Sequence, residues 1–105
     1  MSGISTHVLD TAKGHPAAGI RVRLSLGGAD IGSGVTGEDG RIPALLPQDA
    51  TLEQGRYQIL FETGAYFPRG FFPEVIIAFE VGDETAHYHV PLLISPFTYT
   101  TYRGS

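Results

Sequence analysis

Residues 87–105 read HYHVPLLISPFTYTTYRGS, and this stretch organises the predicted fold. Side chains of an extended strand alternate between two faces, so residues 87–94 should present one apolar row and one mixed row. The apolar row contains Tyr88, Val90, Leu92 and Ile94, and the mixed row contains His87, His89, Pro91 and Leu93. Ser95-Pro96 predicts a turn, and the Thr- and Tyr-rich run 98–102 predicts a second strand that returns beside the first. We therefore expect the apolar row to face a core and the histidines to face away from it.

The rest of the chain shows similar short alternating runs between turns. Strands are predicted over 4–10, 20–26, 31–36, 56–63 and 75–81, with a short edge strand over 42–46. Loops or turns are predicted at 11–19, 27–30, 37–40 and 82–85, with a short helical turn within 64–70. About eight short strands predict an all-β sandwich. The length of 105 residues predicts a single domain, 1–105.

Composition argues against several functional classes. The formal net charge is −4 and no basic cluster occurs, so nucleic acid is not an expected partner. The chain has no cysteine, which excludes disulfides and a thiol nucleophile. Segment 1–10 has no basic stretch followed by an apolar run, so no secretory signal is expected. No apolar run approaches the ~20 residues of a membrane span. We therefore expect a soluble cytoplasmic protein with no membrane partner.

Two histidines are candidates for proton transfer. His89 lies opposite the predicted core row, and His7 lies opposite the predicted core face of its own strand. Histidine titrates near neutral pH, so either residue could give or take a proton in a hydrolysis. If the two strands belong to one sheet, the histidines could share a site. The alternative, on spacing alone, is a pair of surface histidines without chemistry.

The other candidate residues have weaker signals. His87 and His89 point the same way on a strand and could bind zinc, but neither cysteine nor acidic residues at metal-ligand spacing accompany them. Arg41 follows a turn, and the guanidinium groups of Arg41 and Arg103 suit ligands with paired acceptors. Ordinary surface cations are the alternative for both arginines. His15, in a Gly- and Pro-containing loop, is expected to be exposed.

The end of the chain resembles the 5-hydroxyisourate hydrolases, the enzymatic branch of the transthyretin-like proteins. Residues 102–105, YRGS, reproduce the hallmark ending of that family. STHVLDTAKGHPAAGIRVRL (5–24), TGEDGR (36–41), FETGAYF (61–67) and FFPEV (71–75) resemble its opening, its turn-plus-arginine element and its middle. Phe97, Thr98 and Thr100 replace the usual Tyr, Gly and Ser, and none of them is a family catalytic position.

The resemblance implies a fold, an assembly and a reaction. It implies a transthyretin-like two-sheet β-sandwich that forms a homotetramer, with active sites in the channel between dimers. The implied small-molecule substrate is 5-hydroxyisourate, whose six-membered ring is opened by water to 2-oxo-4-hydroxy-4-carboxy-5-ureidoimidazoline in urate catabolism. The implied catalytic residues are His7, Arg41 and His89, and the implied substrate-binding residues are Tyr102, Arg103, Gly104 and Ser105. No cofactor and no metal ion are expected.

The residue chemistry suggests how such a hydrolysis would proceed. One histidine, His89 or His7, deprotonates water, while Arg41 or Arg103 stabilises the charge that develops on the substrate. No covalent intermediate is expected, because no activated nucleophile is evident. His87 matches no family catalytic position, so its replacement is expected to matter little. Two alternatives stay open: a transthyretin-like carrier of small ligands without catalysis, and an accessory domain of a larger enzyme.

Overall fold

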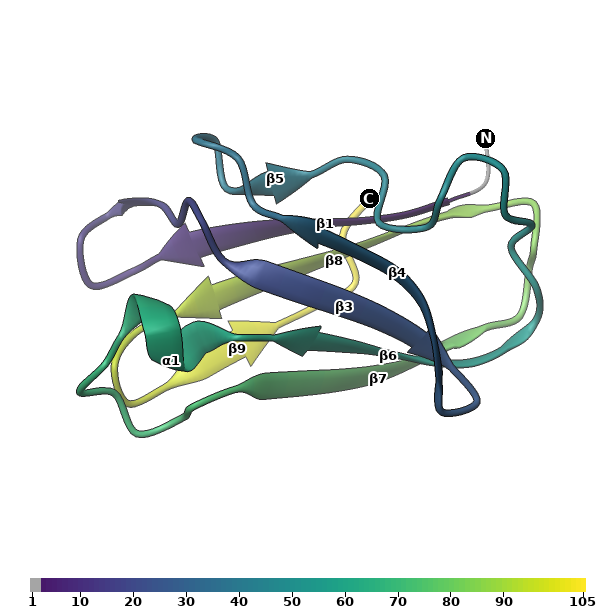
Figure 1. Cartoon of the computed structure of the whole chain (residues 1–105). Coiled ribbons are helices and arrows are strands. Elements are labelled where there is room, and N and C mark those ends of the chain that lie inside the picture. The colour runs from purple at the N-terminus through teal and green to yellow at the C-terminus, as the bar shows by residue number, and fades with distance from the viewer. Residues whose placement is uncertain (1–2) are drawn as a thin grey trace.

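Short strands joined by turns and loops form the framework of the chain, which a computed structural model describes over residues 3–105 (Figure 1). The strands are β1 (Gly3–Asp10), β2 (His15–Pro16), β3 (Arg21–Leu26), β4 (Ala29–Val35), β5 (Arg41–Ile42), β6 (Gly55–Phe61), β7 (Val75–Val81), β8 (His87–Ile94) and β9 (Tyr99–Thr101). A helix, α1 (Thr63–Tyr66), follows β6, and within residues 3–105 no helix is long and apolar enough to cross a membrane. Met1 and Ser2, which begin the segment used above to argue against a secretory signal, lie outside the described residues.

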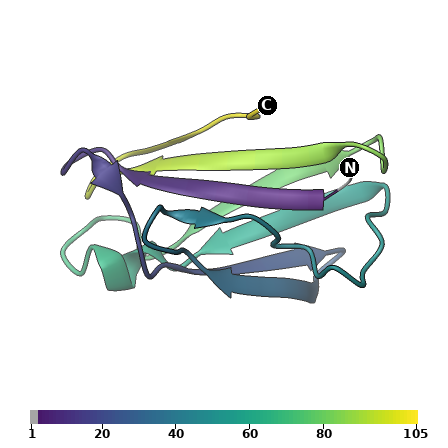
Figure 2. The same ribbon diagram turned by 90° about the horizontal axis from the view of Figure 1, so that it is seen from above.

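The strands form two layers that pack face to face (Figure 2). One sheet has the order β4-β3-β6-β7 and is antiparallel throughout. The other has the order β2-β1-β8-β9, and β5 pairs with β1 as well. Strands β1 and β8 run parallel, although they come from opposite ends of the chain. The prediction of an all-β, two-sheet sandwich with about eight strands and one short helix is confirmed.

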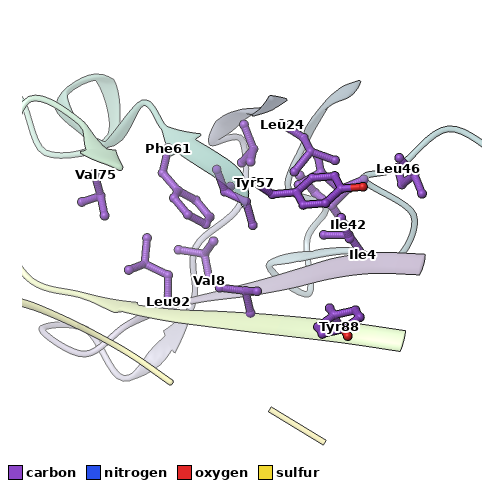
Figure 3. Close-up of a cluster of buried hydrophobic side chains, with 14 of the residues drawn as sticks. Ile4, Val8, Leu24, Ile42, Leu46, Tyr57, Phe61, Val75, Tyr88 and Leu92 are labelled. Carbon is purple, nitrogen blue, oxygen red and sulfur yellow. The ribbon is translucent and has the colours of Figure 1, made fainter. Parts of the chain in front are cut away.

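The core lies between the two sheets, where their apolar rows meet (Figure 3). From β8 it receives the predicted row, Tyr88, Val90, Leu92 and Ile94. Ile4 and Val8 of β1 lie beside this row, and the residues that face it from the other sheet include Val22, Leu24, Tyr57, Ile59 and Phe61. Burying one such side chain contributes about 1.5–3 kcal/mol. Because these inward rows supply the core of the sandwich, the alternate residues of β1 and β8 can carry polar groups.

Two predictions fail where a strand is only two residues long. Segment 11–19 was expected to be a loop, but it contains β2, which pairs with the end of β1. The strand expected over 42–46 is limited to β5, because Pro43 has no N–H with which to continue a ladder. The chain then crosses the end of the sandwich, where the Leu45 N–H donates to the Ile4 carbonyl at 2.8 Å.

A third difference concerns the start of β4. This strand begins at Ala29 rather than at Ile31, because the reversal between β3 and β4 needs only Gly27 and Gly28. Both glycines have positive φ values, 59° and 88°, which glycine adopts without steric cost. The turn therefore ends earlier than the composition of residues 27–30 indicated.

Candidate active site

The outward face of the five-stranded sheet holds the candidate polar residues in two neighbouring rows. In one row, Arg41 of β5 pairs with His7 of β1, and His7 pairs with Pro91 of β8. In the next row, Ser5 of β1 pairs with His89 of β8. Directly paired side chains on one face of a sheet are neighbours about 5 Å apart. The parallel pairing of β1 with β8 therefore unites residues from both ends of the chain in one site.

Ser5 lies between two imidazole rings. Its Oγ is 2.7 Å from Nε2 of His87 and 2.7 Å from Nδ1 of His89. The contact follows from the register, because Ser5 is level with His89, and His87 precedes His89 on the same face. Ser5 is buried, His89 is half-buried and His87 is exposed. Since Ser5 holds Nδ1 of His89, a ligand in the site can reach this ring only through Nε2.

The turn before Arg41 fixes the orientation of His7. The Asp39 carboxylate accepts a hydrogen bond from the Arg41 backbone N–H at 3.0 Å. The Asp39 carbonyl accepts one from Nε2 of His7 at 2.9 Å. Because a carbonyl oxygen can only accept, His7 carries a proton on Nε2, and its Nδ1 is the basic nitrogen. Gly40 has a φ of 76°, and a Cβ there would collide with the Val8 carbonyl, which explains the glycine before Arg41.

The end of the chain passes beside His89. The Gly104 N–H donates a hydrogen bond to the His89 carbonyl at 2.8 Å. A Cβ on Gly104 would lie 2.6 Å from Cδ2 of the His89 ring, so only glycine lets the tail run this close. Between β9 and Gly104 the tail separates from β8 opposite Pro91, because proline has no backbone N–H that could donate a hydrogen bond to the tail. The Pro91 carbonyl instead accepts the Thr101 hydroxyl at 2.7 Å.

Two open pockets adjoin His89. The first, of about 310 Å³, is lined by Ser5, Thr6, Arg41, Pro43, His87, His89 and Ser105. The second, of about 230 Å³, is lined by His89 together with residues that include Tyr88, Tyr102 and Arg103. The Arg103 guanidinium lies over the Tyr88 ring, 4.9 Å from its centroid, in a cation–π contact. The first pocket is therefore rich in groups that can transfer protons, whereas the lining of the second is mainly apolar.

The surroundings of His89 favour its neutral form. Burial lowers the pKa of His89 below its ordinary value of 6.5, because the charged form loses hydration. The positive charges of Arg41, His7 and His87 lower this pKa further. A neutral imidazole with a free Nε2 is the form that can accept a proton from water.

The predicted site residues divide between the two pockets. His7, Arg41, His89 and Ser105 lie around the first pocket or in the row beside it. Tyr102 and Arg103 line the second pocket, and Gly104 packs on His89 between them. The catalytic and binding roles assigned to these residues stay predictions.

Sequence reasoning did not single out Ser5 and did not place His87 beside it. Both residues lie on the outward face with His7 and His89, as the alternation along each strand already indicated. The unrecognised signal was the register between β1 and β8, which brings Ser5 level with His89 and within reach of His87. No property of either strand alone specifies that register.

The three histidines do not form a metal cage within the described part of the chain. Across residues 3–105, no group of three or more His, Cys, Asp or Glu side chains is arranged to hold a metal ion. His87 and His89 direct one ring nitrogen each at the Ser5 hydroxyl, and Nε2 of His7 is bonded to the Asp39 carbonyl.

Comparison with known proteins places this geometry in a family. Residues 4–104 match the HIUase/Transthyretin family. The chain is 45% identical to a 5-hydroxyisourate hydrolase of Deinococcus radiodurans, over 98% of this chain and 96% of that protein. Among solved structures, Klebsiella pneumoniae 5-hydroxyisourate hydrolase aligns with a TM-score of 0.90 and 42% identity, covering 100% of both chains. Sea bream transthyretin in complex with thyroxine aligns at 0.88 and 31% identity, covering 96% of this chain and 93% of its own. With this breadth of agreement in sequence and fold, the chain belongs to the HIUase/Transthyretin family.

Proposed function

We propose that this protein is a 5-hydroxyisourate hydrolase, which opens the six-membered ring of its substrate with water to give 2-oxo-4-hydroxy-4-carboxy-5-ureidoimidazoline in urate catabolism. The observation that carries the proposal is the row of Arg41 and His7 beside the Ser5-held His89, at a pocket on the outer sheet face. Relatives that match nearly the whole chain are 5-hydroxyisourate hydrolases.

His89 acts as the general base in this proposal. Its Nε2 is the ring nitrogen that Ser5 leaves free, and burial and the nearby positive charges lower the pKa of the ring, which favours its neutral form. It removes a proton from a water molecule as the water adds to a ring carbonyl of the substrate. Arg41 stabilises the negative charge that develops on that carbonyl oxygen, because its guanidinium is already placed at the pocket. His7 donates to Asp39 and has a basic Nδ1 with which to orient substrate or water.

The direct test is an assay on freshly made 5-hydroxyisourate. Purified protein should accelerate its loss well beyond the spontaneous decay, with the ureidoimidazoline as product. The competing function is ligand carriage without chemistry, which the likeness to thyroxine-bound transthyretin favours. An unchanged decay curve at high protein concentration, together with saturable ligand binding, would select the carrier function.

The proposal includes a homotetramer with sites at the dimer–dimer interface. Leu9 and Leu93 are half-buried on the same outward face as the histidines, and Tyr102 at its edge is 56% exposed. An apolar surface of this kind on a soluble protein usually marks an interface or a ligand groove. Leu93→Glu should dissociate the assembly and abolish activity while leaving the sandwich folded. A fully active wild-type monomer in sedimentation would rule the interfacial site out.

We further propose that the reaction needs no metal ion or cofactor and takes place in the cytoplasm, in a single domain over 1–105. Arg41 and His89 can supply the polarisation and the proton transfer that zinc would otherwise provide. Activity should therefore survive exhaustive chelation. Loss of activity on chelation, with recovery on adding zinc, would reverse this part of the proposal and make His87 a candidate ligand.

A further inference from the structure

One hydroxyl group links the tautomers of two histidines. The Ser5 Oγ lies 2.7 Å from a ring nitrogen of His87 and 2.7 Å from one of His89. A hydroxyl has a single hydrogen, so it donates to one of these nitrogens and accepts from the other. In the first arrangement, Nδ1–H of His89 donates to Ser5, and Ser5 donates to Nε2 of His87. In the second, Nε2–H of His87 donates to Ser5, and Ser5 donates to Nδ1 of His89.

We propose that Ser5 is a positioning residue that holds His89 in the first arrangement, and that His87 is the final acceptor of the proton taken from water. The inference rests on the proposed hydrolysis. In both arrangements Nδ1 of His89 is occupied by Ser5, so Nε2 is the nitrogen left for water. Only the first arrangement leaves a lone pair on that Nε2, which a general base requires.

The proton transfer balances along this chain of groups. Water gives a proton to Nε2 of His89 as its oxygen bonds to the substrate carbon. His89 releases its Nδ1 proton to the Ser5 oxygen, and Ser5 passes its own hydrogen to Nε2 of His87. His89 and Ser5 end neutral, and His87 ends as an imidazolium with protons on both nitrogens. The cation has moved two residues along β8 without a net charge remaining on His89.

The charges around the site favour this displacement. Around His89, β5 supplies Arg41, β1 supplies His7 and β8 supplies His87. A proton kept on His89 would sit half-buried beside the Arg41 guanidinium, where repulsion and lost hydration both raise its cost. His87 is exposed in the single chain, so a positive charge there loses less hydration than a charge on half-buried His89. Ser5 is only 7% exposed, which keeps solvent from replacing it as the link.

Nitrogen-15 NMR of the imidazole rings tests the linkage without any substrate. At alkaline pH, where both rings are neutral, wild-type His89 and His87 should each carry their proton on Nδ1 and have an unprotonated Nε2. In Ser5→Ala, which retains Cβ at this buried position, His89 should change to the Nε2–H form that dominates in free imidazole. An Nε2–H form of His89 in the wild type, or a tautomer unaffected by Ser5→Ala, would overturn the proposal. This result is independent of the hydrolysis, so it separates failure of the relay from failure of the proposed function.

Kinetics of His87→Gln test whether His87 receives the proton. The amide can still hydrogen-bond to Ser5 but cannot hold a proton, so kcat should fall by roughly tenfold, which is less than the 10²–10⁴-fold loss expected when the general base itself is removed. KM should change less than kcat. The matched control is His15→Gln, because His15 is exposed on β2 and its ring contacts the Pro16 carbonyl, away from the pocket. A kcat for His87→Gln equal to that of His15→Gln would overturn the role of His87 as acceptor.

Discussion

The two sheets have similar inner faces and very different outer faces. The outer face of the four-stranded sheet carries exposed charged and polar side chains, Arg21, Arg23, Arg56, Gln58 and Glu80. The corresponding face of β1 and β8 carries Ser5, His7, His89 and Pro91, all buried or half-buried. The side chains of the first set are all exposed. Partial burial lowers the pKa of His89, and its hydrogen bond to Ser5 fixes the ring, so we expect the chemistry on the outer face of β1 and β8.

The largest difference between the two faces should appear when His89 is removed. His89→Ala should lower kcat by roughly 10²–10⁴, because the general base is lost. Gln58→Ala, on the outer face of the other sheet, is the matched control and should leave kcat unchanged. Steady-state kinetics on 5-hydroxyisourate measure both variants. Similar small losses in the two would show that the outer faces are functionally equivalent and that the histidines are ordinary surface residues.

A smaller effect is expected when the tail is moved away from His89. In Gly104→Ala the new Cβ would meet the His89 ring at 2.6 Å, so the tail must shift. Displacement of a catalytic group by about 1 Å can cost 10²-fold in rate, and we expect a loss of this order with little change in Tm. Gly82→Ala is the control, because a Cβ there meets nothing within 4 Å. Wild-type kinetics in Gly104→Ala would mean that tail contact with the ring is dispensable.

The pH dependence of kcat/KM should reflect the lowered pKa of His89. Because burial and nearby positive charges lower the pKa of His89, the acid limb of kcat/KM for the wild type should lie below pH 6.5. Arg41→Gln removes one of these charges, so the pKa should rise and the acid limb should move to higher pH. Arg23→Gln removes a cation from the other outer face and should not move the limb. A downward shift in Arg41→Gln would contradict this electrostatic account.

The smallest effect is expected on the hydrated face. Arg23→Ala removes an exposed side chain, and its free energy of unfolding should stay within about 0.5 kcal/mol of the wild-type value. Chemical denaturation measures the change, and kcat should be unaltered. A clear loss of activity would show that this face also contributes to the site, for instance through assembly.

The sequence predicted the strands whose apolar and polar side chains alternate. It missed the features that depend on which strands pair with one another. The predicted strand over 87–94 coincides with β8, because these eight residues contain four large apolar side chains at alternate positions, and all four are buried. Strands β2 and β5 have two residues each, too few to carry a period, and they exist only because β1 offers them partners.

The same distinction explains the candidate site. The alternation of side chains along each strand predicted that His7 and His89 lie on outward faces, and the structure agrees. The link through Ser5 depends on the register of two strands that lie far apart in the sequence. His87 was expected to matter little because it matches no family catalytic position, but the register places it within hydrogen-bonding distance of the hydroxyl that also contacts His89.

The parallel pairing of β1 with β8 also has a consequence for biosynthesis. Ser5 and His89 are separated by 84 positions, so β1 emerges from the ribosome long before its partner strand exists. At about 5–20 residues per second, the interval is on the order of 4–17 s. During this time one edge of β1 has unpaired backbone groups, which can template pairing with other nascent chains. The geometry that unites the two ends of the chain therefore makes β1 the segment of this protein most in need of protection during translation.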